Sequence, residues 1–298
     1  MARLRNKPVL GLALAGIILA ASPAIGQSQS GHARSDGVAV AAKTATETAE
    51  ISPYDAEGSS LRVCADPNNL PFSNAEEEGF ENKLADLVAD ELGTKVEYTW
   101  WAERRGFLRN TLNAGACDVV MGTPPLDFLT PTQAYYNSTY VFVSRIKDEL
   151  DVATLTDPVL RELSIGVHLI GDDGANTPAV HVLGQQGIVD NVVGYSIYGN
   201  YEEDSPPSRL VKDVAAGKID VAIVWGPLAG FYAQKSETAL KLTPLEETEK
   251  LLPLVFQFPI GMGVRKDDHD LKDRLNAVIA EKREAIDQLL DEYGIPRV

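Results

Sequence analysis

The sequence is poor in the side chains that most enzyme active sites need. Its 298 residues include four histidines and two cysteines. It contains no G-x-S-x-G turn, no CxxC pair and no HExxH helix, which excludes the serine-nucleophile, thiol-redox and zinc-protease arrangements that these motifs mark. We therefore predict that the protein is not an enzyme and that it has no catalytic residues, no cofactor and no metal ion.

Among the four histidines, only His168 stands at the end of a predicted strand. Asp66 ends an earlier predicted strand, so an acid and base pair across a cleft is one interpretation of the two residues. A strand-end histidine that is hydrogen-bonded to its neighbours is the commoner arrangement. The sequence favours this structural role for His168.

Long apolar runs are lacking too. The run Val9–Ala21 is shorter than the roughly 18 residues that a membrane-spanning helix needs, and no other stretch is as long and apolar. It follows three basic residues and precedes small residues that end at Gly26, which is the pattern of a secretory signal. We expect Met1–Gly26 to be removed and the mature protein to be periplasmic, without a membrane span.

Positive charge is scarce. The chain has 27 Lys and Arg against 43 Asp and Glu, a net charge of −16. Loss of the signal changes this to −19, because Met1–Gly26 holds three basic residues and no acid. Such a surface repels nucleic acid and anionic lipid and favours cationic partners. The next segment, Gln27–Ser60, has no lasting apolar period, so we expect a flexible tether there.

The two cysteines, Cys64 and Cys117, both fall in predicted strands of the first half of the chain. Export permits a disulfide between them. Strand register decides whether their backbones come close enough, and the sequence does not reveal it. The bond therefore stays open at this point.

One pattern of strands and helices occurs twice with a constant offset of 102 residues. LRVCAD (Leu61–Asp66) corresponds to LSIGVH (Leu163–His168), and AGACDVV (Ala114–Val120) corresponds to AGKIDVA (Ala216–Ala222). Between the two anchors of each copy the elements form a βαβ series, which gives a parallel sheet. We predict an α/β protein with two similar lobes, each a mainly parallel sheet flanked by helices. Chance similarity between two ordinary βαβ units is the alternative.

Because the chain must cross between the lobes and return, we expect two hinge strands. We place lobe 1 at Leu61–Ser144 plus Met262–Val298 and lobe 2 at Arg145–Gly261. The carboxyl ends of parallel strands bind ligands in such folds, so a cleft should open between the lobes. Residues expected to line it or to contact a partner are Asp66, Asn68, Asn69, Trp101, Arg105, Tyr135, Tyr136, His168 and Trp225.

Three helices are clear from the apolar spacing. Phe80, Leu84 and Val88 recur at helical spacing before Gly93, which predicts a helix that stops at that glycine. A short helix is expected over Phe107–Asn113, and a single long amphipathic helix from Leu271 to Tyr293. The loop Gly171–Pro178 holds two Asp and an Asn but lacks the alternating spacing of a calcium loop.

From Leu61 to Val298 the order of elements resembles that of type II periplasmic solute-binding proteins. The stretches that carry this resemblance are LRVCADPNNLPFSN, GFENKLADLVADELG, LNAGACDVVMG and AAGKIDVAIVWG. Within that superfamily, YTWWAERRGFLRNTLNAGACDVVMG and YYNSTYVFVSR are similar to the MxaJ/XoxJ group, which is encoded beside quinoprotein methanol dehydrogenases. The resemblance implies an accessory role for a dehydrogenase that carries pyrroloquinoline quinone and a calcium or lanthanide ion. It does not imply that this chain binds either.

The sequence departs from the amino-acid receptors of this superfamily at two positions. Those receptors have an Arg that grips the ligand carboxylate, where this chain has TPPLDFLT (Thr123–Thr130) without an Arg. They also have an acid for the ligand ammonium, where this chain has Trp225. Losing a forked Arg and its counter-charge removes strong, geometrically specific contacts, so we expect that free amino acids do not bind.

Three functional hypotheses remain. The first is a protein that interacts with the large subunit of a periplasmic methanol dehydrogenase and helps to mature or activate it. The second is a solute receptor of an importer for a small solute that is not an amino acid. An enzyme of the cyclohexadienyl dehydratase type, which is built on the same fold, is a distant third.

Overall fold

The computed structural model describes residues 59–170, 176–197 and 202–298, all of which belong to one compact unit, Glu50–Val298. The expected signal peptide, nearly all of the tether and most of the Gly171–Pro178 loop lie outside the described residues. Within the described part of the chain, no helix is both long and apolar enough to cross a membrane.

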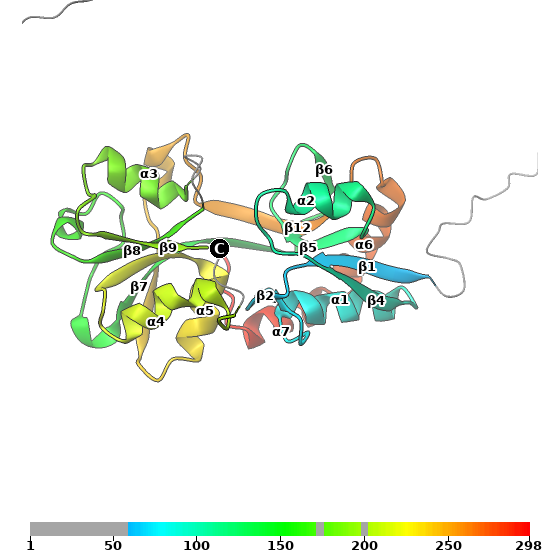
Figure 1. Cartoon of the computed structure of the whole chain (residues 1–298), viewed down its shortest axis with the longest axis horizontal. Coiled ribbons are helices and arrows are strands. Elements are labelled where there is room, and N and C mark those ends of the chain that lie inside the picture. Colours follow the sequence, from blue (N-terminus) through cyan, green and yellow to red (C-terminus); the bar gives the residue numbers. More distant parts are fainter. Residues whose placement is uncertain (1–58, 171–175, 198–201) are drawn as a thin grey trace, which may run out of the picture. The chain divides into compact units, whose positions relative to one another are not determined.

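The first group of strands is built around β1 (Ser60–Ala65). It pairs in parallel with β4 (Lys95–Trp100) on one side and with β5 (Val119–Thr123) on the other. β12 (Gln257–Arg265) pairs antiparallel with β5, and the short β6 (Leu129–Pro131) pairs with β12. The pairing is therefore parallel around β1 and antiparallel at β12 and β6, as the sheet in Figure 1 is arranged.

The second group repeats this plan. β8 (Ile165–Leu169) pairs in parallel with β9 (Val192–Ser196) and with β10 (Val221–Trp225). β7 (Tyr136–Arg145) pairs antiparallel with β10, and β11 (Leu240–Pro244) pairs antiparallel with β7. β9 and β11 were not predicted as strands from the sequence.

β7 and β12 join the two groups. Their first halves pair antiparallel, with Tyr136 opposite Ile260 and Thr139 opposite Gln257, while their remaining residues enter separate groups of strands. The buried apolar residues gather accordingly in separate clusters, one set around β1 and β12 and another around β8 and β10. This is a two-lobed α/β fold, as expected. The residue boundaries proposed for the lobes stay a prediction.

Helices cover both groups of strands (Figure 1). Those of the first group are α1 (Phe80–Glu91), the short α2 (Phe107–Asn110), α6 (His269–Glu281) and α7 (Arg283–Glu292). Those of the second group are α3 (Pro178–Gln185), α4 (Arg209–Ala215) and α5 (Gly226–Gln234). A two-stranded ribbon, β2 (Asn68–Asn69) with β3 (Ser73–Asn74), follows β1.

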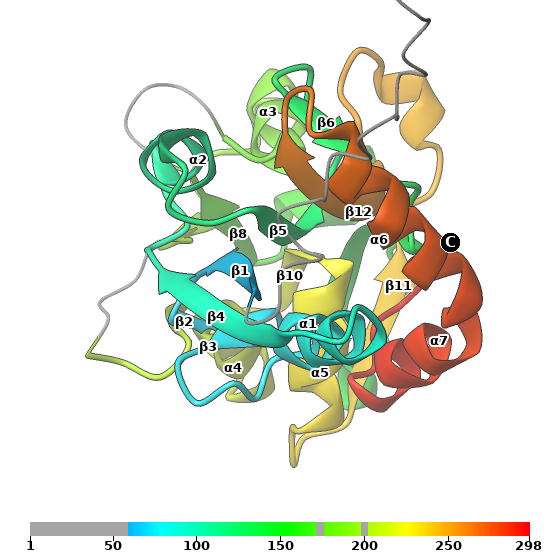
Figure 2. The same ribbon diagram turned by 90° about the vertical axis from the view of Figure 1, so that its right-hand side faces the viewer.

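α1 and α2 lie on opposite faces of the first sheet (Figures 1 and 2). Side chains alternate along a strand, so Leu61 and Val63 of β1 join the core under α1, whereas Cys64 joins Phe107 of α2. Apolar residues on both faces of β1 thus follow from its central position between two parallel neighbours.

α1 begins and ends as its sequence predicts. The side-chain oxygen of Asn82 accepts the Gly79 N–H at 3.0 Å, which gives a backbone donor at the helix start a partner. A Cβ at Gly79 would overlap the carbonyl of Phe72, so the close approach of chain and helix requires glycine there. Gly93 has a φ of +67°, the left-handed conformation expected at a helix stop.

The expected long C-terminal helix is wrong in one respect, because it breaks at Lys282 into α6 and α7. α6 packs on β12, β6 and α1, and α7 packs on α1. The expected helix Phe107–Asn113 also breaks, at Thr111, whose φ of −116° and ψ of −86° are not helical. Its N–H and its hydroxyl both donate to the Phe107 carbonyl, at 3.0 Å and 2.7 Å.

The internal repeat is confirmed in the backbone. Gly115 and Gly217, 102 residues apart, both have a φ of +73°. The N–H of Asp118 donates to the Arg62 carbonyl at 2.7 Å, and the N–H of Asp220 donates to the Ser164 carbonyl at 3.0 Å. Equivalent residues therefore make equivalent turns into β5 and β10.

Cys64 and Cys117 form a disulfide, with their Cα atoms 5.5 Å apart. Cys64 lies in β1, and Cys117 lies just before β5, outside the strand in which it was expected. The bond is possible because β1 and β5 are neighbours, with Cys64 opposite Val120. It ties α2 and its loop to the sheet.

Candidate functional site

A cavity of about 750 Å³ lies where the two lobes face each other, lined by residues of both. The loop after β1 contributes Asp66 and Asn68, and the end of β8 contributes His168. Trp225 closes the end of β10. Because β1, β8 and β10 all end here, the cavity occupies the place where parallel sheets present ligand sites.

Most of the residues expected in the cleft line this cavity. They are Asp66, Asn68, Asn69, Arg105, Tyr136, His168 and Trp225. Trp101 and Tyr135 are not among its lining residues.

Tyr135 is fully buried, and its hydroxyl donates to the Met121 carbonyl at 2.9 Å. Its neighbour Tyr136 begins β7 and reaches the cavity. Successive side chains of an extended segment point to opposite sides, so only one of the two can face the cleft. The expectation placed both there, and Tyr135 belongs to the core.

Trp101 lies on the surface, with 45% of its area exposed. It follows β4, and its backbone N–H donates to the Ala65 carbonyl at 2.9 Å. Its neighbour Trp100 packs instead on Tyr98, with stacked rings 4.4 Å apart. Trp101 is thus an accessible aromatic side chain in the loop that leads to Glu103, outside the cavity.

Asp66 orders the loops at one side of the cavity. One carboxylate oxygen accepts the Asn68 N–H at 2.8 Å and the other accepts the Glu103 N–H at 2.6 Å. The side-chain amide of Asn69 donates to the Glu103 carboxylate at 3.1 Å. Residues that are distant in sequence are therefore held together by one buried carboxylate.

Glu81 and Glu103 are lining residues that the sequence did not single out. Burial, with a smaller contribution from Glu103, raises the pKa of Glu81 to about 8. Burial and the charge of Asp66 raise the pKa of Glu103 to about 7. Glu103 is exposed to the cavity, and water there tempers its shift. Glu81 lies in the first turn of α1, where acids are common because they complement the helix dipole.

His168 is buried and does not form an acid and base pair with Asp66. Its Nε2 lies 3.0 Å from the Pro207 carbonyl, and because a carbonyl only accepts, Nε2 carries the proton. Burial lowers the pKa of the imidazole to about 4. The histidine is therefore neutral at physiological pH, and it has the structural role that the sequence favoured.

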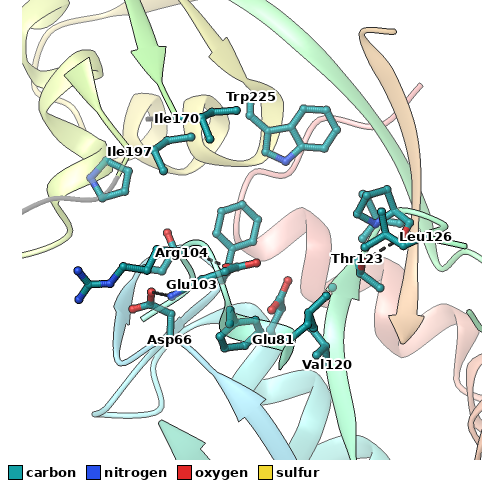
Figure 3. A pocket seen from close by; sticks show the side chains of 18 of the residues that line it. Asp66, Glu81, Glu103, Arg104, Val120, Thr123, Leu126, Ile170, Ile197 and Trp225 are labelled. Atoms are coloured by element: carbon teal, nitrogen blue, oxygen red, sulfur yellow. Dashed lines mark hydrogen bonds between the residues drawn. The ribbon is translucent and has the colours of Figure 1, made fainter. Parts of the chain in front are cut away.

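Aromatic rings form the wall opposite the carboxylates. Trp225 packs edge-on against Tyr140 and Phe258, with ring centroids 5.4 Å and 5.8 Å away. Figure 3 shows Trp225 on one side of the cavity and Glu81 and Glu103 on the other. The cavity thus has an apolar half and an acidic half.

The two positions that anchor amino acids in related receptors are apolar here. Thr123, Pro124 and Leu126 line the cavity, and so does Trp225. These are the places at which the resemblance implied that an arginine and an acid are missing. Within the described residues, no cluster of three or more His, Cys, Asp or Glu side chains offers a metal site.

The chain matches the model of the bacterial extracellular solute-binding proteins, family 3, over residues 61–295. It is 32% identical over 266 residues to the protein MoxJ of Methylorubrum extorquens, covering 85% of this chain and 86% of that protein. These two findings cover both lobes.

Two solved structures are similar as well. The periplasmic binding protein XoxJ of Methylobacterium extorquens AM1 is 35% identical with a TM-score of 0.65, and the match covers 80% of this chain and 99% of that one. MxaJ of Methlophaga aminisulfidivorans MPT is 27% identical with a TM-score of 0.70, covering 80% and 100%. Together the matches show a periplasmic-type binding protein linked to methanol oxidation. The chain belongs to family 3 of the bacterial extracellular solute-binding proteins.

Proposed function

We propose that this protein is a periplasmic accessory protein of methanol oxidation. In this account it binds the large subunit of a methanol dehydrogenase that carries pyrroloquinoline quinone and raises the active fraction of that enzyme. The observation that carries the proposal is a solute-receptor cavity without the two amino-acid anchors, in a chain similar to MoxJ, MxaJ and XoxJ. The fold is retained while the features that recognise amino acids are replaced.

The rim of the cavity supplies the contact surface in this proposal. Trp101 and Phe128 expose 45% and 52% of their area, and Phe128 also lines the cavity. Exposed aromatic side chains are frequent anchors of protein interfaces. The net charge of −16 suits transient, salt-sensitive docking rather than a permanent subunit contact.

The protein acts in this account by binding and not by catalysis, and it holds neither the quinone nor the metal of its partner. His168 is neutral and engaged with a backbone carbonyl, and Asp66 is engaged with two backbone N–H groups. Through these hydrogen bonds, His168 and Asp66 stabilise the surrounding backbone. Glu81 and Glu103 are the other acidic residues that line the cavity.

The experiment is to delete the gene in its host and to complement the strain with variants. We expect the deletion to lower alcohol oxidation by the dehydrogenase, and the unmodified gene to restore it. Trp101→Ala should restore less activity than Leu252→Ala, a control that removes an even more exposed apolar side chain from the second lobe. Equal restoration of activity by both variants would show that Trp101 is not part of the contact surface.

A solute receptor of an importer is the second candidate, favoured by the cavity of about 750 Å³ between the lobes. The same deletion strain distinguishes the two. Unchanged dehydrogenase activity together with loss of uptake of a solute would establish the receptor and refute the accessory role.

A further inference from the structure

We propose that the cavity binds a protonated organic amine that carries no carboxylate. Its ammonium group is held at the end formed by Glu81 and Glu103. Its hydrocarbon part packs on the aromatic wall of Tyr140, Trp225 and Phe258. This inference goes beyond the accessory role and does not depend on it, because a small ligand and a protein partner at the rim are separate matters.

The Glu81 carboxyl group is directed into the cavity (Figure 3) and has no hydrogen-bond or ion-pair partner among the described residues. It packs over the backbone of Gly122 so closely that a Cβ there would overlap it. Glu81 is half-buried, so its carboxyl group keeps only part of its water and gains from a hydrogen-bond donor. The protein supplies none, and a ligand donor entering the cavity would.

Glu103 is held in place but not neutralised. Its only hydrogen bond through the side chain within the described residues comes from the uncharged amide of Asn69. Three arginines also line the cavity, Arg104, Arg105 and Arg109, yet none lowers the pKa of Glu81 or Glu103. When they are ionised, Glu81 and Glu103 favour a cation over an anion at this end of the cavity.

The opposite wall selects the rest of the ligand. Trp225 and its two ring neighbours offer apolar faces and edges, against which an alkyl or aryl group buries its surface. Ring faces also attract cations, so an ammonium near either wall is stabilised. A second, negative group on the ligand would meet Glu81 or Glu103, and this excludes amino acids by repulsion as well as by the missing arginine.

Proton release gives the proposal a second readout. Raised pKa values mean that Glu81 and Glu103 are partly protonated near pH 7. An ammonium ion favours their charged forms, so binding releases protons and tightens as the pH rises from 6 to 8. The other charged or titratable groups around this end are Asp66, Tyr135, Tyr136, His168, Arg104, Arg105 and Arg109.

The test is calorimetry of the purified protein with benzylammonium and n-butylammonium, with benzyl alcohol and benzoate as a neutral and an anionic match. We expect an ammonium probe to bind at least about tenfold more tightly than benzyl alcohol, the size of effect typical of one charged hydrogen bond, and benzoate to give no signal. Repeating the titration in phosphate and in MOPS should give different enthalpies, because protons are released to the buffer.

Glu81→Gln and Glu103→Gln should each weaken the ammonium probe about tenfold and reduce proton release, while leaving benzyl alcohol unchanged. Thermal unfolding of each variant shows that it is folded. Asp273→Asn, an exposed acid of α6, is the control for net charge and should change nothing. Absence of binding by both ammonium probes, equal binding of benzyl alcohol, or full affinity in both glutamine variants would overturn the proposal.

Discussion

Asn68 and Ser205 hold the two sides of the cavity together. The side-chain oxygen of Asn68 accepts the Ser205 N–H at 2.8 Å, and its side-chain amide donates to the Glu203 carbonyl at 2.7 Å. The Ser205 hydroxyl in turn donates to the Leu70 carbonyl at 3.1 Å. The loop after β1 and the loop before α4 are thus joined by three hydrogen bonds, in both directions.

We predict that Asn68→Ala loosens this closed arrangement. Two of the three bonds are lost, which weakens the contact by about 1–3 kcal/mol, so small-angle X-ray scattering should show a larger radius of gyration. Asn69→Ala is the matched control, because Asn69 bonds to Glu103 on its own side of the cavity. An unchanged radius in Asn68→Ala would mean that other contacts hold the lobes together.

The disulfide should contribute substantially to stability. Closing the loop between Cys64 and Cys117, 53 residues apart, stabilises the folded state by at most about 4 kcal/mol in the chain-entropy model. The double variant Cys64→Ala/Cys117→Ala should therefore unfold at lower denaturant concentration. The unfolded, unreduced protein should bind no thiol reagent, and labelling of two thiols would show that the bond does not form.

Asp118 should matter more than its repeat counterpart Asp220. Asp118 is buried and is bonded by Arg62 at 2.8 Å and by Arg265 at 2.8 Å, whereas the Asp220 side chain is 43% exposed. Burial of Asp118 opposes ionisation, but the bonds to Arg62 and Arg265 outweigh it and lower the pKa of its carboxyl group. Asp118→Asn should lower the free energy of unfolding by about 3 kcal/mol, and Asp220→Asn by less.

The pH dependence of this effect follows from the direction of the shift. The pKa of Asp118 is lower in the folded state than in the unfolded chain, so its contribution is present above the unfolded value and is lost as the pH falls through the folded value. Denaturant unfolding between pH 2 and pH 5 should show a flatter curve for Asp118→Asn. Parallel curves for the variant and the unmodified protein would contradict this account.

We also predict that common free amino acids do not bind. The arginine and the acid that would hold a zwitterion are absent from Thr123–Thr130 and from position 225, and the carboxylates of the cavity repel an α-carboxylate. Calorimetry with the individual amino acids should detect no heat of binding. Micromolar affinity for any of them would show that other donors, such as Arg104 or Arg105, replace the missing anchor.

The architecture could be predicted because it depends on local patterns. The repeat, the strand ends and the glycine stops all follow from periodicity and backbone conformation. Asp66, His168 and Trp225 could be assigned to the cavity because each stands at a strand end. The break at Lys282 between α6 and α7 could not be predicted, because the apolar spacing of the sequence continues through it.

The acidic half of the cavity was missed for a physical reason. Glu81 has the sequence context of an ordinary first-turn acid, and Glu103 stands among arginines that suggest pairing. Their role emerges only from long-range packing, which brings α1, the loop after β4 and β5 together. Tyr135 and Tyr136 illustrate the same limit, because a choice between adjacent residues requires the register of β7.

Binding between the purified protein and a purified, cofactor-poor methanol dehydrogenase tests the central claim most directly. Biolayer interferometry should show saturable binding that weakens as salt increases, because charged surfaces dock transiently. Trp101→Ala should bind about tenfold more weakly or worse while it unfolds at the same temperature, and Leu252→Ala should bind normally. No binding at micromolar concentrations in low salt would contradict the account and leave the solute-receptor role in its place.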